Sequence, residues 1–133
     1  KYNIARIREK EESYMNEQKE LFNLLNKKNN IDEIQEYIKK VIEIRGFANQ
    51  RVQDIMLLLS EETGELAKSI RKTLPEDSID YNKIENYTSI EEEIADVFIV
   101  LVSICNKLDI NLYKAFENKE KKNVERKWKI NEE

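Results

Sequence analysis

The chain has 133 residues, enough for one domain with a real core, and its two glycines and one proline are too few for the turns of a strand-rich domain. Its 38 % of charged residues and net charge of −4 exclude a general attraction to nucleic acid or to anionic lipid. The absence of histidine excludes the usual zinc and di-iron sites and a histidine-activated nucleophile, so a bound metal would need carboxylate ligands, which favours magnesium, manganese or calcium.

Five helices are predicted from apolar periodicity and helix-breaking residues, over residues 2–27, 31–45, 49–72, 89–107 and 112–130. The predicted fold class is all-α, a helical bundle of four core helices preceded by an N-terminal helix. That first helix is highly charged and has only a sparse apolar stripe. Residues 1–30 are therefore predicted to be an extension, and residues 31–133 the domain. Residues 73–87 contain the single proline and are predicted to form a loop.

Capping residues mark the predicted helix ends. Asn30, Ser89 and Asn111 are the predicted N-cap residues, and Glu92 is predicted to complete a capping box with Ser89. Gly46 is the predicted left-handed stop of the second helix. These positions define where the helices begin and end more closely than periodicity does.

The fourth predicted helix is apolar in every direction between Val97 and Val102. A helix of this kind is buried on all sides, which predicts the central element of a bundle shared with a partner subunit. Cys105 follows in the same apolar run and is predicted to be a small buried hydrophobe.

The sequence shows no secretory signal and no apolar stretch of about 18 residues, so a cytoplasmic protein is expected.

Four acidic residues lie at core-facing or core-flanking positions of the third and fourth predicted helices. On the third helix, Glu62 falls at the centre of the inward face and Glu65 on its edge, with Glu61 further round. On the fourth helix, Glu93 and Asp96 repeat the spacing of three and flank the apolar arc. Each pair therefore places two carboxylates on one side of its helix.

Converging carboxylates are costly to bury and raise one another's pKa values unless a cation lies among them. The pattern therefore indicates a site for a hard divalent cation. The alternative is that Asp and Glu, 27 of the 133 residues, form such pairs by chance on solvated faces. The central position of Glu62, together with a second acidic pair on another core helix, favours the metal site.

A polar face is predicted on the fifth helix, where Lys119, Asn123 and Arg126 line up at i, i+4 and i+7. Cations and an amide donor on one face suit phosphate oxygens. A solvated, charged helix end is the alternative. Phe47 and Trp128 are candidates for stacking on a nucleotide base, and packing is the alternative role for both.

At these residues the sequence resembles the MazG-like family of all-α nucleoside triphosphate pyrophosphohydrolases. The family's Glu-Glu-x-x-Glu motif corresponds to residues 61–65, and its Glu-x-x-Asp motif to residues 93–96. The sequence around these motifs, at residues 45–50, 57–72 and 91–101, is also similar to the family, as is the later Lys-x-x-x-Asn element at 119–123. The resemblance covers about residues 31–130.

The resemblance implies specific roles for these residues. Magnesium, with manganese as the alternative, would be bound by Glu62, Glu65, Glu93 and Asp96. Glu61 would be a further ligand, and Glu61 or Glu62 would orient or deprotonate the attacking water. Phosphate and sugar contacts would come from Lys119, Asn123 and Arg126, while Arg45 and Phe47 would lie near the base.

The implied substrate is a (deoxy)nucleoside triphosphate, cleaved between its α and β phosphates, and the implied assembly is a homodimer or a dimer of dimers. Two other functions remain open. One is a pyrophosphohydrolase of the same superfold acting on phosphoribosyl-ATP, which the acidic spacing fits less well. The other is a non-catalytic helical interaction module. No nucleic-acid or membrane partner is expected.

Overall fold

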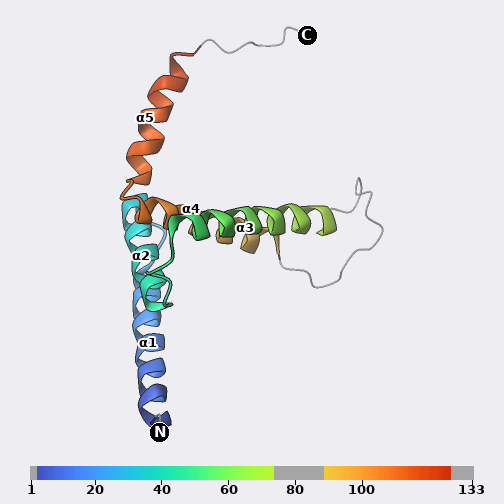
Figure 1. Cartoon of the computed structure of the whole chain (residues 1–133). Helices are drawn as coiled ribbons and strands as arrows, with labels where there is room; N and C mark the ends of the chain where they lie inside the picture. The colour runs from blue at the N-terminus through green and yellow to red at the C-terminus, as the bar shows by residue number, and fades with distance from the viewer. Residues whose placement is uncertain (1–2, 74–88, 127–133) are drawn as a thin grey trace.

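The computed structural model describes residues 3–73 and 89–126 (Figure 1). These residues form helices and no strand, which confirms the predicted all-α class. The helices are α1 (Ile4–Leu24), α2 (Ile31–Ile44), α3 (Val52–Thr73), α4 (Ile90–Lys107) and α5 (Leu112–Val124). Among the described helices, none combines the length and the hydropathy needed to cross a membrane.

The predicted caps are confirmed. Asn30, Ser89 and Asn111 each accept a hydrogen bond from the backbone N–H three residues on, at 2.8 to 3.1 Å. The Glu92 side chain accepts from the backbone N–H of Ser89, which completes the capping box. Gly46 follows α2 with a φ of +86°, a left-handed conformation that glycine adopts without steric cost.

Two helices end earlier than predicted. The first ends at Leu24 rather than 27, because the side chains of Asn26 and Asn29 accept hydrogen bonds from backbone N–H groups and compete with the helix. The fifth ends at Val124 rather than 130, with residues 125–126 in a turn. The predicted loop after Thr73, the last residues of the predicted fifth helix and Trp128 lie outside the described residues.

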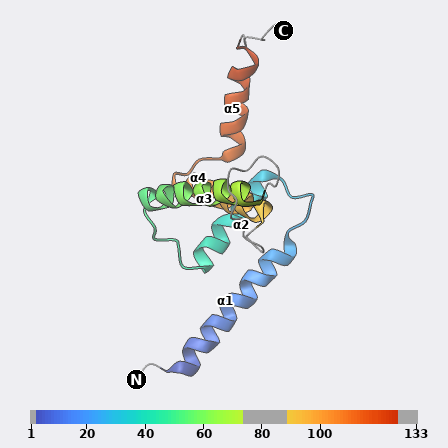
Figure 2. The same ribbon diagram turned by 90° about the vertical axis from the view of Figure 1, so that its right-hand side faces the viewer.

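Helices α3 and α4 lie side by side and antiparallel, and α2 packs against α4 (Figures 1 and 2). Their apolar faces meet in a small core that comprises Ile38, Val41, Ile55, Val100, Val102 and Cys105. Helices α1 and α5 extend away from this core in different directions (Figure 2). Among the residues that the structure describes, the core of one chain therefore comes from three helices rather than the predicted four, because α5 has no buried residue.

A part-buried amide network joins α2 to the end of α4 and the start of α5. The Gln35 side-chain amide donates to Asn106 Oδ1 at 3.0 Å and to the Ile110 carbonyl at 2.7 Å, and its oxygen accepts from the Leu112 N–H at 3.0 Å. Asn106 returns a hydrogen bond to the Gln35 carbonyl at 3.2 Å. One side chain thus serves both the C-terminal end of α4 and the first turn of α5.

The substitution Gln35→Ala is expected to lower the free energy of unfolding by about 1–3 kcal/mol, because it leaves part-buried polar groups of α4 and α5 without partners. Urea unfolding would measure the change. Gln53→Ala, at an exposed position of α3, is the matched control and should stay within about 0.5 kcal/mol of the parent. Equal effects in the two variants would contradict a structural role for the network.

Candidate metal centre and adjoining cavity

Three carboxylates converge where α3 and α4 pack together. Glu62 of α3 and Glu93 and Asp96 of α4 each offer one oxygen, and these oxygens all lie within 4.8 Å of one another. Glu93 and Asp96 are three residues apart, which places both on the side of α4 that meets α3. The structure therefore brings together three of the four acids predicted to bind metal.

The spacing of the oxygens is close to that around a single cation. Ligands of Mg²⁺ lie at about 2.1 Å, so opposite ligand oxygens are about 4.2 Å apart, and those of Ca²⁺ about 4.8 Å. The three oxygens lie no more than 4.8 Å apart, which is compatible with either ion. The whole sequence contains no histidine, so an all-oxygen site for a hard cation fits the residues present.

The three carboxylates differ in burial. Glu93 is only 5 % exposed, Glu62 is half-buried and Asp96 is exposed. Helical phase predicts Glu62 as the most central acid, whereas the structure buries Glu93 more deeply. The missed signal is the spacing of seven between Glu93 and the buried Val100, which places both on one face of α4.

The environment of Glu62 opposes its ionisation. Burial is the largest cause that raises the pKa of Glu62, and the nearby charges of Asp96 and then Glu93 raise it further. Glu61 and Glu65 act in the same direction with smaller effects. A bound cation would reverse this balance, because it stabilises the ionised form of every surrounding carboxylate.

Glu65 and Glu61 lie at the margin of the cluster. Glu65 is half-buried on α3 and Glu61 is exposed, and neither belongs to the three-carboxylate group. Both nevertheless lie close enough to influence the pKa of Glu62. The structure thus supplies a tight group of three acids with two further acids beside it.

The predicted phosphate-binding face lies elsewhere in the chain. Lys119 and Asn123 are on α5, which extends away from the α3–α4 pair (Figures 1 and 2). The Asn123 amide donates to Glu120 at 2.8 Å. Arg126 lies two residues beyond the end of the helix at Val124, so the three residues do not lie on one continuous helix. Within one chain these residues do not approach the acids.

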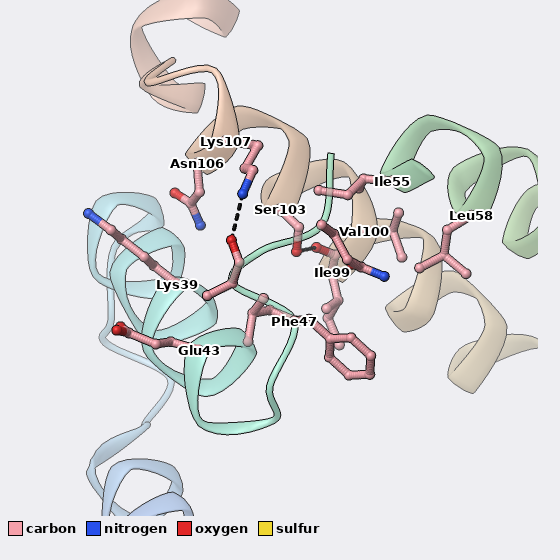
Figure 3. Close-up of a pocket in the computed structure, with 13 residues that line it drawn as sticks. Lys39, Glu43, Phe47, Ile55, Leu58, Ile99, Val100, Ser103, Asn106 and Lys107 are labelled. Atoms are coloured by element: carbon pink, nitrogen blue, oxygen red, sulfur yellow. Dashed lines mark hydrogen bonds between the residues drawn. The ribbon is translucent and has the colours of Figure 1, made fainter. Parts of the chain in front are cut away.

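Arg45 and Phe47 lie in the segment between α2 and α3. Arg45 Nε donates to the Gln18 side chain of α1 at 2.7 Å, so its guanidinium is directed to α1. Phe47 is exposed and lies at the rim of a cavity of about 360 Å³ (Figure 3). The two residues predicted to lie near the base therefore have different surroundings. Arg45 binds α1, and Phe47 borders a cavity.

The cavity is mainly apolar and contains a few polar groups. Its apolar lining comes from α2, α3, α4 and the segment before α3, and comprises Ile42, Phe47, Ala48, Ile55, Leu58, Ile99 and Val100. The polar side chains are Lys39, Glu43, Gln50, Ser103, Asn106 and Lys107. Lys107 Nζ donates to the Ala48 carbonyl at 2.5 Å, which fixes the segment before α3 against α4 (Figure 3). Sequence reasoning identified Phe47 but not the cavity, because its walls come from three helices.

The cavity and the carboxylate cluster are neighbours along both helices. Leu58 lines the cavity, and Glu62 lies four residues later on α3; on α4, Asp96 lies four residues before the cavity residue Val100. Residues four apart share a helix face and are separated by about 6 Å along the axis. A ligand with an apolar or aromatic part in the cavity could therefore also reach a cation held by the acids.

A comparison with known families decides the classification. The MazG nucleotide pyrophosphohydrolase domain matches residues 50–130, which include all three clustered carboxylates. The chain belongs to this family. The match spans α3, α4 and α5, whereas α1, α2, Arg45 and Phe47 precede it.

A curated relative is also similar to this chain. It is the uncharacterized protein YpjD of Bacillus subtilis (strain 168), which is 41 % identical over 63 residues. The aligned part is 47 % of this chain and 55 % of the relative, so the chain spans about half the length of the curated relative it matches. No solved structure gives a significant match.

Proposed function

We propose that this protein is a magnesium-dependent nucleoside triphosphate pyrophosphohydrolase, which converts a (deoxy)nucleoside triphosphate and water into the monophosphate and pyrophosphate. Family membership supports the reaction class. The observation that carries the proposal is the group of three carboxylate oxygens within 4.8 Å, one of them from the buried Glu93. Such a group is costly without a cation and is well suited to a hard one.

Glu62, Glu93 and Asp96 are proposed to hold the ion, and Glu65 to complete the set from the next turn of α3. When bound, the ion supplies positive charge to the phosphate oxygens and acidifies the attacking water. Glu61, exposed beside Glu62, is proposed to orient that water or to accept its proton. With no nucleophilic side chain in the cluster, direct in-line attack by water on the α-phosphate is the simplest route.

The triphosphate is proposed to lie at the acids and the nucleoside in the adjoining cavity. Phe47 at the rim offers a face for stacking on the base. A largely apolar pocket with a few polar groups is typical of small-molecule sites. The cavity and the acids are about one helical turn apart, so a nucleoside in the cavity would place its phosphates towards the acids.

A second copy of the chain is proposed to complete the site. Lys119, Asn123 and Arg126 are the proposed contacts to phosphate and sugar, yet α5 extends away from the acids of its own chain. Helices α3 and α4 also keep exposed apolar side chains, among them Leu57 at 71 % and Ile94 at 53 %. A homodimer or a dimer of dimers would cover these apolar residues. It would also bring the basic side chains Lys119 and Arg126 of one copy to the acids of the other, where they would stabilise the leaving pyrophosphate.

The test is pyrophosphate release across a panel of canonical and modified ribo- and deoxyribonucleoside triphosphates, with Mg²⁺ and with chelator. Turnover of at least one nucleotide that stops on chelation is expected. Phosphoribosyl-ATP belongs in the same panel, because turnover of it alone would assign the protein to the other branch of the superfold. Absence of both turnover and Mg²⁺-dependent nucleotide binding across the panel would favour a non-catalytic interaction module.

A further inference from the structure

Helix α1 has an exposed apolar face that the described part of its own chain leaves uncovered. No residue of α1 is buried, and α2 contacts it only near its C-terminal end, where Gln18 and Leu21 are half-buried. The N-terminal half of α1 extends away from the rest of the molecule (Figures 1 and 2). At 100° per residue, an arc of about 100° contains five exposed apolar side chains: Ile4, Ile7, Tyr14, Met15 and Phe22.

The helix also lacks the local features that stabilise the other helices. Asn3 at its N-cap makes no side-chain capping bond, whereas the N-caps of α2, α4 and α5 all do. Its first turn contains no acid and its last turn no base, so the helix dipole is not compensated. Because most helical stability in proteins comes from packing, an α1 helix with no N-terminal side-chain cap and no packing along its N-terminal half has few contacts that stabilise it. Packing against a partner would supply the missing stabilisation.

The charge order along α1 indicates what that partner is. The first seven residues contain three bases and one acid, which are Arg6, Arg8, Lys10 and Glu9. Residues 11–20 contain four acids and one base, which are Glu11, Glu12, Glu17, Glu20 and Lys19. A parallel copy would place like charges together. An antiparallel copy places the basic segment of each helix opposite the acidic segment of the other and opposes the two helix dipoles.

We propose that α1 binds α1 of a second copy of this chain in an antiparallel, two-fold symmetric pair. Such a pair is isologous, so the same residues form both halves and the contact closes on itself. With the two-fold axis near Ser13, Ile4 of each helix lies opposite Phe22 of the other. Lys10 then lies near the partner helix's acidic segment, and Tyr14 and Met15 occupy the centre. The two ends of the apolar arc, Ile4 at 64 % and Phe22 at 62 % exposed in the single chain, become covered.

Cross-linking of the full chain tests the orientation. The double variant Ile4→Cys with Phe22→Cys is treated with a short bis-maleimide linker, which tolerates a small shift in register. The two positions are 18 residues apart, about 27 Å along one helix, so the linker cannot join them within a chain. The proposal predicts a covalent dimer at least about fivefold more abundant than with Ile4→Cys or Phe22→Cys alone, because an antiparallel pair separates identical positions.

Controls make the result specific to this face. Cys105 is buried and is retained in all variants, so the parent chain should give no covalent dimer. Glu9→Cys with Asn16→Cys places two thiols on the opposite, polar face of α1 and should also give none. Strong cross-linking by either single variant would indicate a parallel pair, and no excess over the parent would indicate no pair; either outcome overturns the proposal. Nucleotide turnover has no part in this measurement, so it succeeds or fails independently of the proposed activity.

Discussion

Glu93→Gln is expected to reduce Mg²⁺-dependent pyrophosphate release by about 100-fold or more in kcat/KM. Changes to groups that merely support a metal ligand already cost about 10–100-fold in metal affinity or activity, and Glu93 is the most buried carboxylate of the cluster. Glutamine preserves the size of the side chain and removes its charge, so the packing of α3 against α4 should be kept. Steady-state kinetics with a nucleotide that the parent cleaves would measure the loss.

Metal binding can be followed separately from turnover. In the parent, Mg²⁺ at 100 times its dissociation constant should stabilise the fold by about 2.7 kcal/mol, seen as a rise in Tm. Glu93→Gln and Glu62→Gln should lose most of that rise. Glu91→Gln, an exposed change in the first turn of the same helix, is the matched control and should retain both the rise and the activity. A Glu93→Gln protein that is still stabilised by Mg²⁺ and still turns over would remove Glu93 from the metal site.

Much of this arrangement was accessible from sequence, because it depends on local geometry. The caps at Asn30, Ser89 and Asn111 follow from side chains that satisfy nearby backbone N–H groups, and all three are observed. The grouping of Glu62 with Glu93 and Asp96 follows from helical phase together with the packing of two apolar helices. Both inferences require only the period of the helix and the direction of its apolar face.

The features that sequence reasoning missed depend on contacts between distant segments. The burial of Glu93 depends on how α4 packs against α3. The cavity beside Phe47 is lined by α2, α3 and α4 together. The direction of α5 is set by its junction with α4, where Gln35 binds the Leu112 N–H. Periodicity within α5 contains no information about that direction. The sequence therefore predicts a polar face on α5 but not where that face lies relative to the acids.

Stability in the absence of divalent cations is expected to fall as the pH rises from about 4.5, the ordinary value for glutamate, through the raised pKa of Glu62. In this window the folded state holds a proton at Glu62 that the unfolded state has lost, so the folded state binds more protons and raising the pH favours unfolding. Above the raised pKa, Glu62 is charged in both states and its full destabilising effect is present. Urea unfolding at a series of pH values with chelator would measure the slope.

Asp54 does not obscure this slope. The hydrogen bond from Arg51 is the main cause that lowers the pKa of Asp54, so Asp54 titrates at more acidic pH and acts in the opposite direction. Glu62→Gln should flatten the slope above pH 4.5 and stabilise the cation-free protein at neutral pH, whereas Glu91→Gln should leave the slope unchanged.

Mg²⁺ provides the decisive arm of this experiment. If Glu62 is a metal ligand, saturating Mg²⁺ should invert the slope in the parent, because cation binding requires the ionised carboxylate and strengthens as the pH rises. Glu62→Gln should then show little response to Mg²⁺ at any pH, and its stability without cation should exceed that of the parent. A parent protein whose slope is the same with and without Mg²⁺ would mean that the acids of α3 and α4 repel one another without binding a cation, and the proposed chemistry would lose its basis.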